Sequence, residues 1–310
     1  MKKKCLISGG TGYLGVHLAK FLKPEYEVIL GARNNKQNFK ANELTGCKVI
    51  PMDVTSMASV RDAILIAKPD IIIHAAATKF IDLSEIYTME CWDINVVGSQ
   101  NVARAAMEFG VDTVIGISTD KAVPPIKSSY GLSKAVMERM FCASNGVAKT
   151  KFACIRFGNI AWSTHSVFTI WKEKGVRLTD PNMRRFFFPV SEAVEFINLV
   201  LNRIDSFAGT VVMKKLKSAR MGDVADAWIK VYPGTIERIP VREGERIDEY
   251  LLGEMELTQS VEEIHQFNEC FVIKFNDYFE THPAELFSTA NAERLTEEEI
   301  IQLITNEPQN

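Results

Sequence analysis

The sequence contains no apolar run that approaches the roughly 18 residues of a membrane-spanning helix, so we expect no transmembrane segment. The first residues, MKKK, are followed by only three apolar residues, CLI, which are too few for the core of a secretion signal. The net charge is −3 and the pI is about 6.0, so no basic excess indicates binding to nucleic acid or to an anionic membrane. These absences favour a cytoplasmic protein.

Cysteine and histidine are scarce as well. The six cysteines form no CxxC pair, and neither they nor the five histidines show the spacing of metal ligands. Scattered cysteines are typical of small buried side chains in a reducing compartment. We therefore expect no metal site, and we interpret His74, at the end of an apolar run, as a buried, hydrogen-bonded residue.

Apolar residues make up 46% of the 310 residues, which is enough for one large or two modest folded domains. Over the first part of the chain, short apolar runs that predict strands alternate with stretches of helical periodicity. This alternation predicts an α/β fold with a doubly wound parallel sheet, helices on both faces and a smaller C-terminal domain. We place the first domain at 1–160 and the second at 161–310, with a segment near 190–215 returning to the first. We predict a loop over 178–190.

The first predicted strand is followed directly by the stretch SGGTGYLG, which opens a predicted helix. Its glycines match the spacing of a dinucleotide-binding loop, where they allow a tight turn and let the backbone approach a pyrophosphate. Free N–H groups at the helix N-terminus favour the same anion. The loop residues expected to contact the dinucleotide are Gly9, Thr11, Gly12, Tyr13, Leu14 and Gly15.

The residue that follows the second predicted strand bears on the choice of dinucleotide. No acidic residue stands there, and the sequence carries Arg33 instead. An acidic residue would bind a ribose diol, whereas an arginine favours a 2′-phosphate, so we expect NADP, with NAD as the alternative. Asp53, after the third predicted strand, could reach the adenine or cap the helix that follows.

Tyr130 and Lys134 lie one helical turn apart and therefore share a helix face. A tyrosine titrates near pH 10, and a fixed lysine cation beside it should lower its pKa. Tyr130 could then remove a hydroxyl proton while hydride leaves the adjacent carbon. An adjacent acid and base, Asp120 and Lys121, precede this pair.

These motifs together resemble an extended short-chain dehydrogenase/reductase. The resemblance includes the glycine loop, HAAA at 74–77, Asn95 in DINVVGSQNV, the Ser-Thr pair ending at Thr119, and the Tyr/Lys pair. It implies that Asn95 positions the lysine through water and that the hydroxyl of Thr119 orients the substrate. The further cofactor-binding residues that it implies are Val54, Ala75, Ala76, Ala77 and Asn95.

A narrower resemblance is carried by STDKAV, RFGNI, TDPNMRRFFFPVSEAV, REGERIDEYLL and FSTANAERLTEEEIIQLI, which together span nearly the whole chain. They look like the inverting UDP-N-acetylglucosamine 4,6-dehydratases of polysaccharide and flagellin-sugar pathways. In these lyases, oxidation at carbon 4 acidifies the hydrogen at carbon 5, and water then leaves from carbon 6. The resemblance implies Asp120 as the acid for the leaving hydroxyl, and Lys121 as the base that also reprotonates carbon 5 from the other face.

The same resemblance implies a UDP-sugar as the partner and a homo-oligomer as the assembly. Arginine suits bidentate phosphate contacts, and two arginines are among the implied substrate residues. The chain departs from the usual family pattern after Asn159, where WSTHSV contains no arginine and carries Trp162 and His165. The implied substrate contacts are Lys79, Asn159, Arg185, Arg242 and Glu245.

The two elimination roles make opposite physical demands. Lys121 must be neutral to act as a base, so we expect burial and the nearby Lys134 to lower its pKa. Asp120 must hold a proton, which requires a dry site or a second carboxylate close by. Three other functions remain alternatives: a 4-epimerase, which would not need Asp120 and Lys121, a 5,6-dehydratase, and a non-catalytic NADP-binding regulator. Asp120 and Lys121 could also form a simple loop ion pair without a catalytic role.

Overall fold

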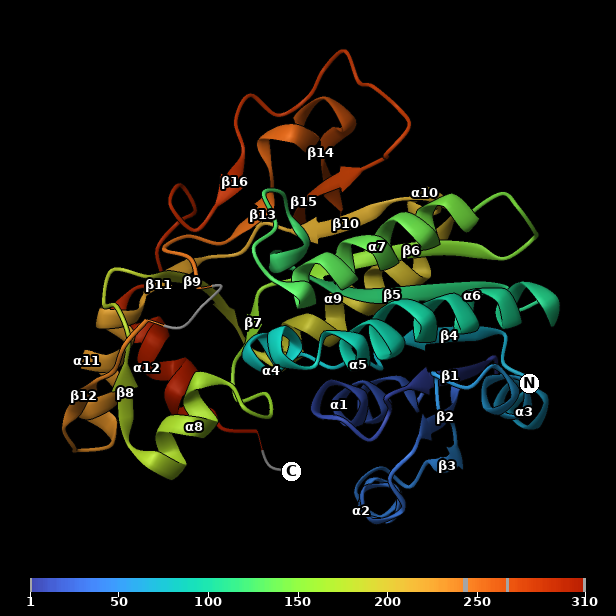
Figure 1. Ribbon diagram of the computed structural model, residues 1–310, viewed down its shortest axis with the longest axis horizontal. Helices are drawn as coiled ribbons and strands as arrows, with labels where there is room; N and C mark the ends of the chain where they lie inside the picture. The colour runs from blue at the N-terminus through green and yellow to red at the C-terminus, as the bar shows by residue number, and fades with distance from the viewer. Residues whose placement is uncertain (1, 242–244, 266–267, 309–310) are drawn as a thin grey trace.

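The computed structural model describes residues 2–241, 245–265 and 268–308, and it consists of a central sheet between two layers of helices, with a smaller lobe at one end (Figure 1). The sheet has nine strands in the order β14-β15-β10-β6-β5-β4-β1-β2-β3. All neighbours from β10 to β3 are parallel, whereas β15 pairs antiparallel with β10 and β14 antiparallel with β15. Their bounds are β1 (Lys4–Ser8), β2 (Glu27–Ala32), β3 (Lys48–Pro51), β4 (Ile71–His74), β5 (Thr113–Thr119), β6 (Lys151–Phe157), β10 (Val211–Lys214), β14 (Ser260–His265) and β15 (Asn268–Ile273).

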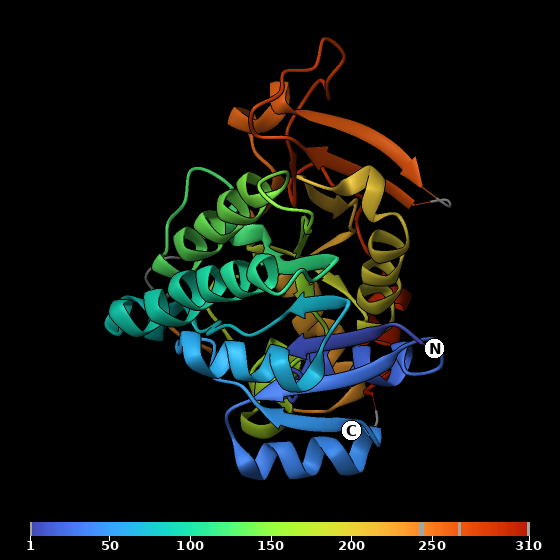
Figure 2. The ribbon, with the colours of Figure 1, turned by 90° about the vertical axis from the view of Figure 1, so that its right-hand side faces the viewer.

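Helices cover both faces of this sheet, as Figure 2 shows. One layer contains α1 (Tyr13–Leu22), α2 (Asn35–Thr45) and α9 (Val190–Asn202), and the other contains α3 (Met57–Ala67), α6 (Gly98–Glu108) and α7 (Ser129–Ser144). The central strands are buried on both sides, which explains why β1 and β4 read as continuous apolar runs. The predicted doubly wound α/β fold is therefore confirmed. The shorter helical segments are α4 (Ile81–Ile86), α5 (Thr88–Trp92), η1 (Asp93–Val97), η2 (Asp120–Ala122), α10 (Ile204–Phe207) and η3 (Glu254–Gln259).

The smaller lobe has an aromatic core of its own. Trp228 lies at its centre, with ring centroids 5.8 Å from Trp162, 5.7 Å from Trp171 and 5.7 Å from Phe168. Buried aromatic rings of this size let a small set of elements form a separate core. The lobe and the short strand pairs beside it comprise β7 (Asn159–Ile160), α8 (Val167–Lys174), β8 (Val176–Leu178), β9 (Arg184–Phe188), β11 (Ser218–Arg220), α11 (Met221–Val231), β12 (Ile236–Arg238), β13 (Tyr250–Leu252), β16 (Phe287–Ser288) and α12 (Glu297–Thr305).

Two parts of the architecture differ from the sequence prediction. The predicted loop over 178–190 was wrong, because β9 lies within it and pairs with β7 and β11. Phe186, Phe187 and Phe188 are all buried there, which outweighs the turn signal of the preceding Pro181 and Asn182. The predicted return near 190–215 contains α9 and β10. The later strands β14 and β15 also join the main sheet, which the sequence did not predict. The division into two domains stays a prediction.

The expectations about cysteines and about membrane-spanning helices can be compared with the structure. All six cysteines are free thiols, and all are buried except the half-buried Cys142, which confirms their packing role. Within the described ranges, no helix combines the length and the apolar character needed to cross a membrane.

Candidate active site

A cleft of 1530 Å³ runs along the carboxyl ends of the parallel strands, where the main sheet meets the smaller lobe. Open α/β sheets place their ligands at this edge. The loops that follow β1, β4, β5 and β6 all contribute to its walls, and the smaller lobe contributes Arg185 and neighbouring residues. Of the predicted site residues, those that line the cleft are Gly9, Thr11, Gly12, Tyr13, Leu14, Gly15, Arg33, Val54, Ala75, Ala76, Ala77, Lys79, Thr119, Lys121, Tyr130, Lys134, Asn159, Arg185 and Glu245.

The glycine loop has the backbone that a dinucleotide cradle requires. Gly9 has a φ of +67°, and a Cβ there would lie 2.7 Å from the Cα of Ala76 at the end of the neighbouring strand. A Cβ at Gly15 would lie 2.6 Å from Gly10, so α1 can approach the loop only because that residue is glycine. Gly12 is the N-cap of α1 and carries no side chain to occupy the N–H groups of the first turn. The residues therefore fit an anionic dinucleotide.

Arg33, which directly follows β2, also lines the cleft. Its guanidinium is exposed and lies 3.9 Å from Asp53 Oδ1, so it remains accessible to a 2′-phosphate. Asp53 itself does not line the cleft, and its Oδ1 accepts hydrogen bonds from the backbone N–H and the hydroxyl of Thr55, at 3.0 and 2.8 Å. Of the two roles left open for Asp53, the structure shows the local one, in the turn before α3.

Asn95 and His74 lie behind the cleft wall. Asn95 is fully buried in η1, and its amide bonds both the N–H and the carbonyl of Thr78 and donates to Ser133 Oγ. This holds the segment after β4 against α7, without a place on the cleft surface. His74 bonds Ser8 and Ser99 with its two ring nitrogens, and burial lowers its pKa to about 3, so its predicted role as a buried hydrogen-bonded residue is confirmed.

Tyr130 and Lys134 both face the cleft from α7, but their electrostatics differ from the prediction. Burial raises the pKa of Tyr130 to about 12, and the largest opposing charge is that of Lys121, followed by a hydrogen bond with Thr119. Lys134 directs its Nζ toward Met137 Sδ, 3.4 Å away, and burial lowers its own pKa to about 8. The expected lowering of the Tyr130 pKa by Lys134 was therefore wrong for this state of the cleft.

Asp120 and Lys121 form an ion pair of 2.9 Å in the short η2 turn that follows β5. Asp120 is completely buried and also accepts a hydrogen bond from Thr119 Oγ1 at 2.9 Å. Burial lowers the pKa of Lys121, but Asp120 and the nearby Glu249 outweigh burial, and the net pKa is raised. The expectation that burial and Lys134 would lower it was wrong, because two carboxylates face the ammonium.

The predicted substrate residues lie where the cleft meets the smaller lobe. Asn159, in β7, donates from Nδ2 to the carbonyl of Phe186 at 3.2 Å. Arg185, in β9, donates to the carbonyls of Arg184 and Arg246 at 2.8 and 3.0 Å, which fixes its guanidinium in the cleft wall. Lys79 lies at the mouth of the cleft, and burial of its ammonium lowers its pKa. Arg242 lies outside the described residues.

Sequence reasoning missed several residues of the cleft. Glu249 lies 3.6 Å from Lys121 and 3.9 Å from Arg185, but it is distant from both in sequence. Arg246 also lines the cleft, although it stands in the same REGER stretch as the predicted residues. His165 has a φ of +60° and packs edge-on against Phe80, with ring centroids 4.9 Å apart. The departure from the family pattern after Asn159 was the signal for His165, and the signal for Glu249 was its place in the stretch REGERIDEYLL.

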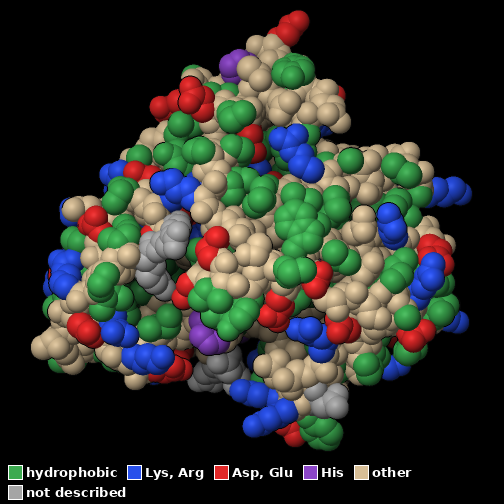
Figure 3. Space-filling model, in the orientation of Figure 1, with side chains coloured by type: hydrophobic (Ala, Val, Ile, Leu, Met, Phe, Trp, Pro, Cys, Tyr) green, Lys and Arg blue, Asp and Glu red, His purple; other side chains and the backbone are tan. Residues whose placement is uncertain are grey.

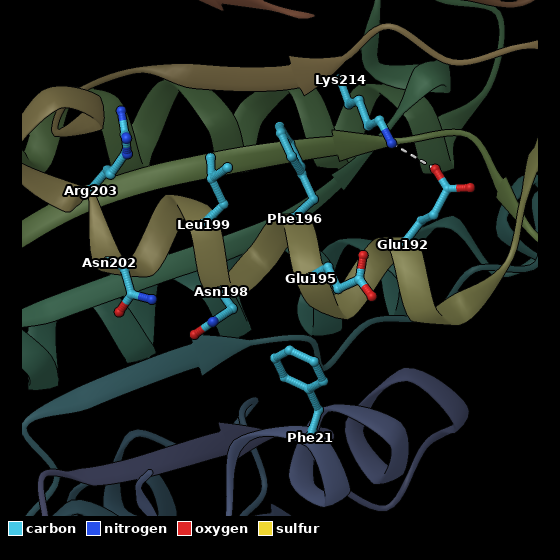
Figure 4. Close-up of a pocket in the computed structure, with 9 residues that line it drawn as sticks. All are labelled: Phe21, Glu192, Glu195, Phe196, Asn198, Leu199, Asn202, Arg203 and Lys214. Carbon is cyan, nitrogen blue, oxygen red and sulfur yellow. Dashed lines mark hydrogen bonds and ion pairs between the residues drawn. The ribbon is translucent and has the colours of Figure 1, made fainter. Parts of the chain in front are cut away.

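A second, smaller hollow of 290 Å³ lies away from this cleft, between α1 and α9 (Figure 4). Figure 4 shows Phe21 of α1 directed toward Asn198 and Glu195 of α9, and it shows the ion pair between Lys214 and Glu192, which measures 2.7 Å. None of the predicted site residues lines this hollow. The chemistry expected from the sequence is therefore gathered in the larger cleft.

Comparisons with known proteins agree with this geometry. A UDP-N-acetylglucosamine 4,6-dehydratase (inverting) from Campylobacter jejuni serotype O:2 is 31% identical over 298 residues, covering 89% of this chain and 86% of that protein. A UDP-glucose 4-epimerase from Rickettsia bellii is 30% identical over 333 residues, covering 98% of this chain and 96% of that protein. Both are enzymes of nucleotide sugars, so the chain is related to sugar-nucleotide enzymes of two activities.

Solved structures show the same fold. Pen from Bacillus thuringiensis superposes with a TM-score of 0.87 at 24% identity, covering 99% of this chain and 98% of that one. A UDP-glucose 4-epimerase from Thermus thermophilus, in complex with NAD, superposes with a TM-score of 0.68 at 20% identity, covering 78% and 88%. Residues 5–270 match the family described as polysaccharide biosynthesis protein. The chain therefore belongs to the polysaccharide biosynthesis protein family, within the Rossmann-like enzymes that modify nucleotide sugars.

Proposed function

We propose that this protein is an NADP-dependent lyase that removes water from UDP-N-acetylglucosamine to give a 4-keto-6-deoxy sugar with inversion at carbon 5. The observation that carries the proposal is the ion pair of 2.9 Å between the buried Asp120 and Lys121, because Lys121 lines the same cleft as Tyr130 and Lys134. A 4-epimerase needs only the last two. The inverting dehydratase of Campylobacter jejuni among the relatives supports the same assignment.

The cradle formed by the glycine loop and the exposed Arg33 support NADP as the cofactor. When bound, it would accept hydride from carbon 4 and return it at carbon 6, so that it is regenerated in each turnover. Gly9, Gly12 and the first turn of α1 would hold its pyrophosphate. Lys134 would contact the ribose end of the site, since its lowered pKa and its place beside Tyr130 suit a hydrogen-bond donor in a dry pocket.

The chain's own groups would then move the protons. Thr119 would orient the carbon 4 hydroxyl, and Tyr130, as the phenolate that the charge of Lys121 favours against burial, would receive its proton during oxidation. In the elimination, Lys121 would take the proton from carbon 5, a double bond would form between carbons 5 and 6, and the carbon–oxygen bond at carbon 6 would break. Asp120 would give its proton to the hydroxyl, which would leave as water. The ammonium of Lys121 would later return a proton to carbon 5.

The ion pair offers a route to the protonation states that this elimination needs. Asp120 must be a neutral acid and Lys121 a neutral base, and transfer of one proton from the ammonium to the carboxylate produces both at once. Burial penalises the charged form of each group, so a dry cleft filled by substrate favours this transfer more than the open cleft does. The raised pKa of Lys121 in the open cleft is consistent with an ion pair before substrate binds.

Mass spectrometry of the sugar nucleotide after incubation with the enzyme and NADP tests the assignment. We expect loss of one water from UDP-N-acetylglucosamine, no loss with Lys121→Ala despite intact NADP binding, and no oxidation with Tyr130→Phe. Water loss by Lys121→Ala at the parent rate would make the base assignment wrong. A product of unchanged mass that chromatography separates from the substrate as its 4-epimer would favour the second candidate, a 4-epimerase, which the Rickettsia bellii relative supports.

We also propose that the protein forms a homo-oligomer through the outer surface of α4, α5 and α7. Apolar side chains gather on this side of the molecule, as Figure 3 shows over the helices that face the viewer in Figure 1. Exposed apolar patches of this kind mark association surfaces. The exposed fraction of Met89 is 83%, and sedimentation of Met89→Glu against the parent would test the surface. The exposed apolar residues of these helices are Leu83, Ile86, Tyr87, Met89, Trp92 and Leu132.

A further inference from the structure

Lys121 lies between two buried carboxylates that come from distant parts of the chain. Its Nζ is 2.9 Å from Oδ1 of Asp120 and 3.6 Å from Oε1 of Glu249. Asp120 is 0% exposed and Glu249 is 4% exposed. The second oxygen of each carboxylate, Asp120 Oδ2 and Glu249 Oε2, is buried without a hydrogen-bond partner among the described residues.

The burial of Asp120 creates a problem for its role as an acid. Lys121, Thr119 and Glu249 line the cleft, whereas Asp120 does not. Lys121 is bonded directly to the carboxylate, so this carboxylate can reach a leaving hydroxyl only after the lysine side chain moves. Once Asp120 is a neutral acid, the ammonium that forms when Lys121 takes the carbon 5 proton needs another negative partner, because an unpaired buried charge is costly.

Glu249 is held firmly in a position to receive that ammonium. It stands directly before β13, where its backbone N–H donates to Thr289 Oγ1 at 3.1 Å and its carbonyl accepts from the Thr289 N–H at 2.8 Å. Thr289 also donates its hydroxyl to Asp248 at 2.8 Å, which ties both strands of this pair together. The same Oε1 lies 3.9 Å from Nε of Arg185. Glu249 therefore connects Lys121 to a side chain expected to bind the substrate.

We propose that Glu249 is a positioning residue of the elimination: when the sugar nucleotide enters the cleft, Lys121 gives one proton to Asp120, and its neutral amine shifts from Asp120 to Glu249. The shift uncovers Asp120, so that its carboxyl can face the carbon 6 hydroxyl, and it keeps the lysine amine on the carbon 5 side. Arg185, whose guanidinium is fixed in the cleft wall, would bind the substrate from that place, which leaves the Glu249 carboxylate available to Lys121. This inference rests on the proposed lyase function, and it adds a role for a residue outside the Tyr130, Lys134, Asp120 and Lys121 set.

The test separates oxidation from elimination in single turnovers with UDP-N-acetylglucosamine and NADP. Glu249→Gln keeps the shape of the side chain but removes its charge, so the ammonium that Lys121 forms on taking the carbon 5 proton would lack a buried counter-charge. We expect reduced cofactor to form and accumulate, seen at about 340 nm, while water loss slows on the order of 10²-fold, the size of a misplaced proton transfer. KM should change little, because the defect follows binding. Glu249→Asp, which keeps the charge, should recover part of the rate.

Glu195→Gln is the matched control, since Glu195 is exposed on α9 in the smaller hollow and should leave both steps unchanged. Water loss by Glu249→Gln at the parent rate would overturn the inference. So would a parallel fall of oxidation and water loss with no recovery in Glu249→Asp, since that would show only structural support. If the parent enzyme itself oxidises the sugar but releases no dehydrated product, the proposed function fails, and this outcome is distinct from both.

Discussion

Arg156 provides a test of how the site is supported from beneath. This arginine, in β6, is almost fully buried, and its guanidinium donates two hydrogen bonds to Glu138 at 2.7 Å each. It donates two more to Glu256, at 2.9 and 2.7 Å, and one to the carbonyl of Leu251 at 3.1 Å. Glu138 lies one turn beyond Lys134 on α7, so the network connects α7 to the segment that follows Glu249.

Arg156→Met should destabilise the protein strongly, because it leaves two buried carboxylates without their counter-charge. Removal of one partner from a buried ion pair costs about 3–5 kcal/mol. Some of each carboxylate's hydrogen bonding remains, since Glu138 keeps the Ser118 hydroxyl at 2.6 Å and Glu256 keeps the Gly253 N–H at 3.1 Å. A chain of 310 residues unfolds with an entropy of roughly 0.65 kcal/mol/K, so Tm should fall by about 5–8 °C.

The assay is thermal and denaturant unfolding of Arg156→Met beside the triple variant Glu138→Gln, Arg156→Met and Glu256→Gln. The triple variant removes the charges together, so it should be clearly more stable than the single one. A single variant as stable as the parent, or a triple variant no better than the single, would refute the reasoning.

Three further predictions concern single positions. Gly9→Ala should abolish NADP binding, because its Cβ would lie 2.7 Å from Ala76. Gly110 also has a positive φ but no neighbour within 4 Å, so Gly110→Ala should lower the free energy of unfolding by only about 1–2 kcal/mol. Calorimetry measures the binding, and denaturant unfolding measures the stability of both variants. Lys134→Met should abolish activity yet raise stability at pH 7 by up to about 3 kcal/mol. The lysine's folded pKa of about 8 lies below its unfolded value, so stability rises as pH increases between the two values, and the advantage of the variant should vanish above pH 10.5 or so. In His74→Asn, stability should fall less steeply on acidification than in the parent. Below roughly pH 6.5 the unfolded state of the parent binds a proton that the folded His74, with a pKa of about 3, does not, and this lowers the free energy of unfolding by up to about 1.4 kcal/mol per pH unit. Parallel pH profiles of stability for the two proteins would contradict this.

Much of the fold was predictable because local patterns and tertiary packing agree. The helix α3 buries Val60, Ala63, Ile64 and Ala67, which stand at helical spacing in the sequence, so pattern and packing coincide there. The glycine loop was predictable because only glycine fits its close approach. The strand β9 was missed because its burial comes from partners in distant segments.

The candidate site was only partly predictable for the same physical reason. Motifs located Tyr130, Lys134 and the Asp-Lys pair, because their spacing along the chain is part of their chemistry. Charges depend on three-dimensional neighbours, so the raised pKa of Lys121 could not be read from residues 118–134. Glu249 reaches the cleft only because β13 pairs with β16, and no local pattern predicts that contact.

Under the proposed function, Asp120 and Lys121 make this protein a dehydratase that inverts carbon 5. Proton NMR of the purified protein with UDP-N-acetylglucosamine and NADP in deuterium oxide tests it most directly. The account predicts a 4-keto-6-deoxy product with inverted configuration and deuterium at carbon 5. A 4-epimer without deuterium at carbon 5, or a dehydrated sugar that retains its original configuration there, would contradict it.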